Sequence, residues 1–103
     1  MKVDLHAAGI QLPSTAKSVI CRHAYFELSR FADTLQRITI RLSKDATPPL
    51  ELDMACRVVV DWPQLGTIEA VTRHSDPIQA ACDGVSRVRR RLLCRLKVAN
   101  RFR

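Results

Sequence analysis

The clearest structural signal in the sequence is the run Leu35-Gln36-Arg37-Ile38-Thr39-Ile40-Arg41-Leu42-Ser43. From Ile38 to Leu42 every second residue is apolar, which is the period of a β-strand with one buried and one exposed face. Residues 50–62 and 67–74 alternate in the same way, and the turn Pro63-Gln64-Leu65-Gly66 separates them. Because strands joined by short loops pair antiparallel, these runs predict a three-stranded meander with one apolar face.

The N-terminal segment predicts a further strand and a helix. Residues 2–7 alternate, and helical spacing then runs to about residue 32, with Ser14 or Thr15 able to cap the first free amides. The apolar stripe of this helix is Ala16, Ile20, Ala24, Leu28 and Phe31. Tyr25 and Phe26 fall outside the stripe. Either the helix shifts its phase there and packs both rings, which we expect, or an aromatic patch is exposed.

The C-terminal segment predicts a second, longer helix. Asp76 is a suitable cap and Pro77 suits the first helical position, and apolar residues recur at spacings of three and four to at least residue 99. Gly84 weakens a helix interior, so it indicates a close approach by another element, for which we expect the first helix. The predicted fold is an α+β two-layer sandwich in the order β-α-β-β-β-α, with a four-stranded sheet and both helices packed on one face.

Length and composition favour one small globular domain over residues 1–103. Hydrophobic residues make up 47% of the chain and charged residues 26%, which is ordinary for a protein with a packed core. No apolar run approaches the roughly 20 residues of a membrane-spanning helix, and the N-terminus does not resemble an export signal. We therefore expect a soluble protein without a membrane partner, with the cytoplasm as its default location.

Cysteine and histidine positions argue against a metal site and against catalysis. Four cysteines lie far apart without a C-x-x-C pair, at positions Cys21, Cys56, Cys82 and Cys94. We expect reduced, mostly buried thiols, since even the nearby Cys21 and His23 would point about 160° apart on a helix. No glycine-rich phosphate loop, nucleophile motif or paired carboxylates are present. The sequence predicts no enzyme, no metal, no cofactor and no small-molecule substrate.

The charge of the chain points to a polyanionic partner. The formal net charge is +7, and arginine supplies most of the 17 basic residues. The last helix carries the densest group, namely Arg87, Arg89, Arg90, Arg91 and Arg95. Only Arg87 has an acidic residue at i,i+4 spacing, so the group repels itself unless a polyanion neutralises it. The competing interpretation is a solvated helix face with no ligand.

Several segments together resemble one bacterial family. They are Leu28-Ser29-Arg30-Phe31-Ala32-Asp33, the strand Ile38-Thr39-Ile40-Arg41-Leu42-Ser43-Lys44, and Ala80-Ala81-Cys82-Asp83-Gly84-Val85 followed by Arg87, Val88, Arg90 and Leu92. With the element order and the length, they resemble the ribosome hibernation-promoting factor and ribosome-associated inhibitor family across nearly the whole chain. The aromatic residue that usually precedes the last helix is absent at Ile78, and Cys94 stands where the family often has a lysine.

The resemblance implies a translation inhibitor without a cofactor. Such a protein binds rRNA of the small ribosomal subunit in the mRNA/tRNA channel during stress or stationary phase. The resemblance implies that the basic positions of the family correspond in this chain to Arg87 and Arg90 in the last helix and to Lys17 and His23 in the first. Charge alone adds the RNA-binding candidates Arg22, Arg91, Arg95 and Lys97. A second basic row, of Arg37, Arg41 and Lys44, fits either another rRNA contact or a soluble sheet face.

Two rival functions remain open at this stage. The first is a binding module for another RNA, of the kind that double-stranded-RNA-binding domains represent. The second is a diverged protein-interaction or dimer module that no longer binds RNA, for which Tyr25 and Phe26 would supply the contact surface. Self-association is compatible with the sequence but nothing in it supports it. The length matches short members of the family, and the basic end of the chain leans towards those that permit ribosome pairing.

Overall fold

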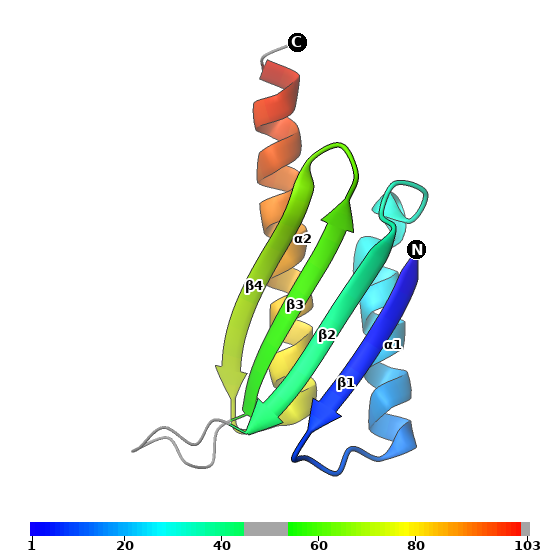
Figure 1. The fold of residues 1–103 in the computed structure, drawn as a ribbon, viewed down its shortest axis with the longest axis vertical. Helices are drawn as coiled ribbons and strands as arrows, with labels where there is room; N and C mark the ends of the chain where they lie inside the picture. The colour runs from blue at the N-terminus through cyan, green and yellow to red at the C-terminus, as the bar shows by residue number, and fades with distance from the viewer. Residues whose placement is uncertain (45–53, 102–103) are drawn as a thin grey trace.

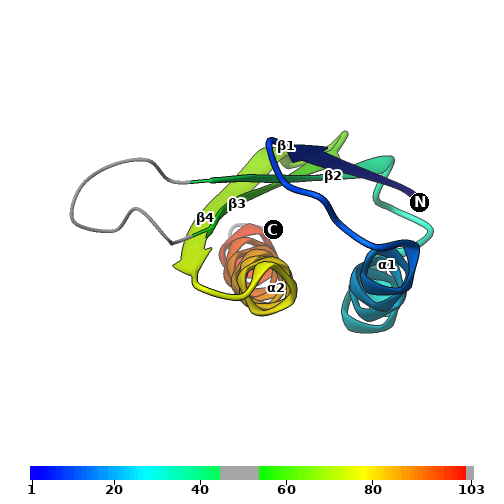
Figure 2. The ribbon, with the colours of Figure 1, turned by 90° about the horizontal axis from the view of Figure 1, so that it is seen from below.

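The chain folds into a four-stranded sheet with two helices on one face (Figures 1 and 2). The computed structural model describes residues 1–44 and 54–101. In chain order the elements are β1 (Lys2–Ala8), α1 (Ser14–Leu28), the 3-10 turn η1 (Ser29–Phe31), β2 (Arg37–Lys44), β3 (Met54–Trp62), β4 (Gly66–His74) and α2 (Pro77–Arg101). The predicted α+β fold and its element order are confirmed.

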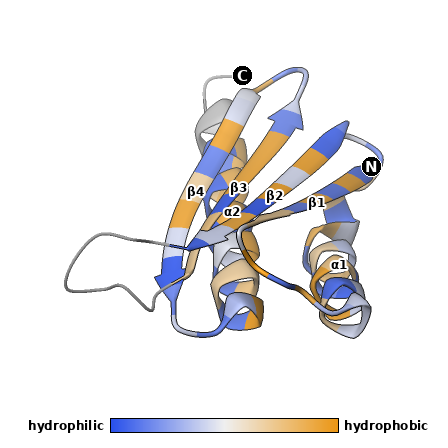
Figure 3. Cartoon of the chain, turned by 60° about the horizontal axis from the view of Figure 1, so that its bottom comes forward, coloured by the Kyte–Doolittle hydropathy of each residue, from blue (hydrophilic) through white to orange (hydrophobic). Residues whose placement is uncertain are grey.

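The sheet has the spatial order β1-β2-β3-β4. β1 runs parallel to β2 through the α1 crossover, and the other two pairs are antiparallel. Alternation along the strands places one set of side chains against the helices and leaves the other face open, and the bands of hydropathy in Figure 3 follow this alternation. The predicted beginning of β3 near residue 50 lies outside the described residues.

The core lies between the sheet and the two helices. From the strands, Ile38, Ile40, Leu42, Val58, Val60 and Ile68 are fully buried, and Ile20, Leu28, Val85, Val88 and Leu92 meet them from the helices. Trp62 at the end of β3 also belongs to this core, and its ring centroid lies 5.8 Å from that of Phe31. The stripes read from the sequence therefore mark the buried face of each element correctly.

The irregularity expected within α1 lies at its end instead. α1 is regular through Leu28, and η1 then tightens the chain so that Phe31 still reaches the core. Tyr25 and Phe26 therefore stay on the outside of a regular helix, so the expectation that both rings pack inside is wrong. The predicted cap is also absent: α1 begins at Ser14 directly after Pro13, with no side-chain bond to its first amides.

The start of α2 agrees with its sequence signal. The backbone amide of Ile78 donates to Oδ1 of Asp76 at 2.9 Å, and Pro77 occupies the first helical position. This bond satisfies one of the amides that a helix leaves free at its beginning. The cap fixes where α2 leaves the end of β4 and hence how the helix lies across the sheet.

Gly84 marks a close approach, but to the sheet and not to α1 as predicted. A Cβ atom placed on Gly84 would lie 2.7 Å from Cγ2 of Val58 and 3.3 Å from Oγ1 of Thr72. Both residues belong to the strands beneath α2. The missing side chain therefore lets α2 pack directly on β3 and β4, which supply the three atoms nearest to that Cβ position.

A buried hydrogen bond next to this crossing fixes the first turns of α2. Oγ1 of Thr72 donates to the carbonyl oxygen of Ala80 at 2.6 Å in the core. We expect Thr72→Val to lower the free energy of unfolding by about 1 kcal/mol, because the shape is kept while the buried bond is lost. Urea unfolding measures this difference. The matched control is Thr67→Val on the exposed face of β4. Among the described residues, the side chain of Thr67 makes one hydrogen bond, from its Oγ1 to Oδ1 of Asp61 at 3.5 Å. Equal stability of the two variants would contradict a stabilising role for the Thr72 bond.

Candidate nucleic-acid interface

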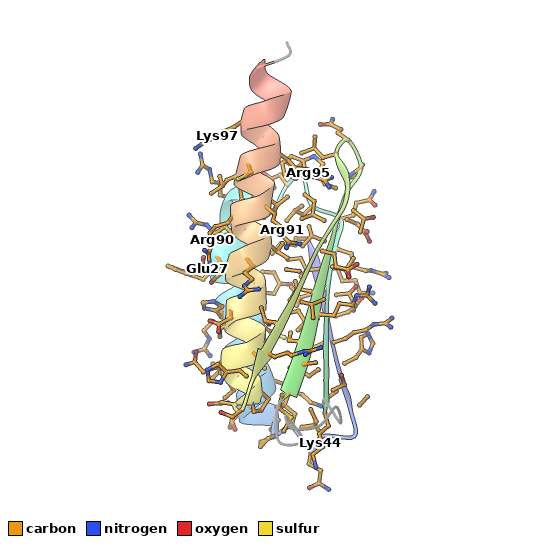
Figure 4. The ribbon with its side chains drawn as sticks, turned by 90° about the vertical axis from the view of Figure 1, so that its left-hand side faces the viewer. Glu27, Lys44, Arg90, Arg91, Arg95 and Lys97 are labelled. Atoms are coloured by element: carbon orange, nitrogen blue, oxygen red, sulfur yellow. The ribbon has the colours of Figure 1, made fainter. Side chains whose placement is uncertain are left out.

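The outer face of α2 carries three cations that point away from the sheet. Arg87, Arg90 and Lys97 are exposed, and within residues 1–44 and 54–101 none of them forms an ion pair. Figure 4 shows Arg90 and Lys97 on the side of α2 opposite the strands. Side chains of one sign on neighbouring turns of a helix attract a polyanion. These three candidates therefore share one exposed helix face, and their contact with RNA stays a prediction.

Arg91 and Arg95 leave this face and turn towards β4 (Figure 4). Nη1 of Arg91 donates to the carbonyl oxygen of Glu69, and Nη1 of Arg95 donates to that of Leu65 at 2.9 Å. Both bonds join α2 to the edge strand and to the turn before it. The expectation that these arginines have no partner considered only acidic side chains, whereas main-chain oxygens of β4 and of the turn before it accept hydrogen bonds from both. Contact of Arg91 and Arg95 with RNA stays a prediction.

Arg89 has an acidic partner on the other helix. Its Nε lies 3.7 Å from Oε2 of Glu27 on α1, and both side chains are partly buried. The expectation that the arginines after Arg87 lack acidic partners considered only pairs within one helix. The ion pair joins α1 to α2 and neutralises one positive charge at the boundary between them.

On α1 the three candidate cations do not share one surface. Lys17 lies about 140° from Arg22 around the helix and therefore on another flank. Arg22 and His23, together with Val19 and Phe26, line a hollow of about 330 Å³ whose wall is almost entirely apolar. Nε2 of His23 is buried and has no hydrogen-bond partner among the described residues. This hollow did not figure among the predicted sites, although its residues have the i, i+3, i+4, i+7 spacing of a second helical stripe.

The open face of the sheet divides the second predicted row. Nε of Arg37 lies 3.3 Å from Oδ2 of Asp4, and this ion pair compensates the positive charge of Arg37. Arg41 lies in register between His6 and Arg57, and Arg57 in turn contacts Glu69 at 2.6 Å. Lys44 has the opposite parity along β2, so its side chain starts from the face that the helices cover. The three residues therefore do not form one basic row.

The cysteines are free thiols, as the sequence predicted, but only Cys56 is fully buried. Burial raises the pKa of Cys56 to about 12, with a further contribution from Cys82 nearby. Burial and the carboxylates of Asp83, Asp76 and Glu27 raise the pKa of Cys82 as well. Both groups are therefore protonated thiols at neutral pH, a form that neither attacks electrophiles nor ligates metals well.

No group of three or more His, Cys, Asp or Glu side chains that could hold a metal ion occurs in the described ranges. Among the helices in that same part of the chain, none is long and apolar enough to cross a membrane.

Comparison with known proteins gives a structural match without a sequence match. No model of a known protein family matches the sequence, and no curated protein matches it either. A ribosomal subunit interface protein from Coxiella burnetii superimposes with a TM-score of 0.76 at 15% identity, over 94% of this chain and 99% of the other. The Thermus thermophilus Protein Y N-terminal domain superimposes with a TM-score of 0.71 at 16% identity, over the full length of both chains.

The chain has the fold of these two proteins. The match covers the sheet and both helices, so the elements that carry Arg22, Arg87, Arg90 and Lys97 belong to the shared architecture. At this level of identity the likeness concerns the fold, and the role of each basic side chain follows from its own surroundings.

Proposed function

We propose that the chain acts as a ribosome hibernation factor in the cytoplasm during stress or stationary phase. It binds rRNA of the small ribosomal subunit in the channel of mRNA and tRNA and inhibits translation by occupying that channel. The observation that carries the proposal is the exposed cationic face of α2, which has no ion pairs among the described residues and lies on a fold shared with a ribosomal subunit interface protein. The sequence segments that resemble the hibernation family support the same function.

The mechanism needs only binding. Arg87, Arg90 and Lys97 would contact phosphates, with Arg22 of α1 joining them at the side. Each contact releases condensed counterions from the RNA, and arginine adds a planar donor pair that matches a phosphate. The packed sheet and helices then exclude mRNA and tRNA from the space that the domain occupies. No bond is made or broken and no cofactor takes part.

Sedimentation with purified small subunits tests the proposal. We expect the protein to move with the subunits through a sucrose gradient and to be displaced when mRNA and tRNA occupy the channel first. Six or more phosphate contacts would weaken binding by about 10³-fold or more between 50 and 200 mM salt. Two results would contradict the proposal: binding to subunits whose channel is already filled, or enrichment of duplex RNA from a lysate without ribosomal subunits.

A further inference from the structure

The hollow on α1 has a chemistry that phosphate contacts do not use. Its wall combines Val19 and Phe26, two of the large apolar side chains that the described part of the chain exposes. Phe26 is 77% exposed although it lies on a regular helix with a fully buried opposite face. Exposed apolar groups that gather around a hollow are typical of a binding site.

We propose that this hollow binds one unstacked nucleobase of the RNA strand that the protein contacts, with Phe26 as the stacking surface. The inference rests on the proposed function and adds a contact with a base to the proposed contacts with phosphates. A volume of about 330 Å³ lies at the small end of ligand sites, which suits a single base better than a larger group. Single-stranded RNA is commonly held in this way, with its bases stacked on aromatic side chains next to basic ones.

The charges around the hollow select an anionic strand over an apolar protein segment. Arg22 is one of the residues that line the hollow. A ligand therefore binds there most favourably if it carries a negative charge beside a flat apolar group. Glu27 follows Phe26 directly and would repel such a strand, but its ion pair with Arg89 neutralises it. A nucleotide has a phosphate for Arg22 and a base for Phe26, which combines both requirements in one unit.

Tyr25 provides a matched control on the same helix. It is 48% exposed but does not line the hollow, and it lies about 100° from Phe26 around α1. Replacing either ring by alanine removes exposed aromatic surface without opening the core. A difference between Phe26→Ala and Tyr25→Ala therefore reports on the hollow and not on the fold or on general hydrophobicity.

The experiment compares two probes with equal phosphates, a single-stranded 12-nucleotide RNA and an abasic strand of the same length. Fluorescence anisotropy across a salt series gives the affinity of each. We expect the wild type and Tyr25→Ala to prefer the probe with bases by about 5- to 150-fold, the range that stacking of one base supplies. Phe26→Ala should lose this preference while keeping the salt dependence, because it removes no phosphate contact. Arg22→Gln should instead weaken both probes and reduce the salt slope by about 0.7.

A tryptophan at the same position extends the test to the ribosome. Phe26→Trp keeps a stacking ring and places an indole in the hollow, while the native Trp62 stays buried in the core. We expect its fluorescence to be quenched when RNA or small subunits bind.

Each outcome decides between the two proposals. Equal affinity of wild type and Phe26→Ala for the probe with bases, or binding to subunits without quenching, would overturn the nucleobase site and leave the proposed function standing. Failure of the wild type to bind both subunits and RNA would overturn the proposed function and the nucleobase site together. If Phe26→Ala abolishes a self-association seen by analytical ultracentrifugation and leaves the base preference intact, the hollow is a protein contact and the proposal is wrong.

Discussion

Replacing Arg87, Arg90 and Lys97 together by glutamate is expected to abolish co-sedimentation with small ribosomal subunits. Each of the three side chains is exposed on α2 and has no ion pair among the described residues. We therefore expect the change to lower the free energy of unfolding only slightly. On binding, three attractive contacts with phosphates become three repulsive ones. The loss of counterion release at three contacts corresponds to about 10²- to 10³-fold in affinity near 0.1 M salt, and repulsion adds to it. Sucrose gradients and a salt series measure both effects.

The control for this variant makes the same change in net charge elsewhere. Lys2 on β1, Lys17 on α1 and Lys44 on β2 are exposed and do not belong to α2. Lys17 and Lys44 are candidates from the sequence that the proposed contact surface does not include, so the joint replacement of the three by glutamate alters the long-range field but not that surface. We expect this variant to bind within about tenfold of the wild type, as screened interactions at a distance allow. If both triple variants lose binding to the same extent, the net charge and not the α2 face determines affinity.

Gly84→Ala is expected to destabilise the protein, although alanine favours a helix over glycine by about 1 kcal/mol. The new methyl group would lie 2.7 Å from Cγ2 of Val58, which is fully buried and, as a β-branched residue, has little freedom to rotate away. Overpacking of this kind costs about 1–3 kcal/mol, and moving the whole helix outwards would disturb the Thr72 bond as well. We therefore expect a net loss of up to about 2 kcal/mol in the free energy of unfolding.

A double-mutant cycle assigns this loss to the crossing of α2 with β3. Val58→Ala removes the atoms that obstruct the new methyl group, at a cost of its own for the cavity it leaves. The double variant Gly84→Ala with Val58→Ala should then be more stable than the sum of the single changes predicts, by about 1 kcal/mol or more. Strict additivity in urea unfolding would show that the glycine is required for some reason other than close packing.

The sequence predicted the fold well because the period of two along the strands is a property of each segment by itself. From Ile38 to Leu42 the buried and exposed residues follow the pattern without exception. Gly84 shows where this information ends. A glycine within a helix indicates a close neighbour, but which element provides that neighbour depends on how the helix crosses the sheet, and no local pattern contains the crossing.

The candidate site was harder to predict than the fold for the same reason. Arg90 and Arg91 are adjacent and identical in the sequence, yet Arg90 points outwards while Arg91 bonds to the main chain of β4. Successive residues point about 100° apart on a helix, and the edge strand beside α2 then gives Arg91 an acceptor that Arg90 does not reach. The division of Arg37 and Arg41 from Lys44, in contrast, follows from strand parity and was accessible from the sequence alone.

The two bonds from Arg91 and Arg95 have a consequence for how the sheet ends. An edge strand normally offers its free carbonyl groups to any other extended chain, and this is how many sheets grow into fibres. Here arginines occupy carbonyl oxygens at Glu69 and at Leu65 and set two positive charges beside β4. A fifth strand would have to displace both and come next to those charges. The same helix that presents cations to the solvent thereby limits the sheet on this side to four strands and protects the folded protein against aggregation.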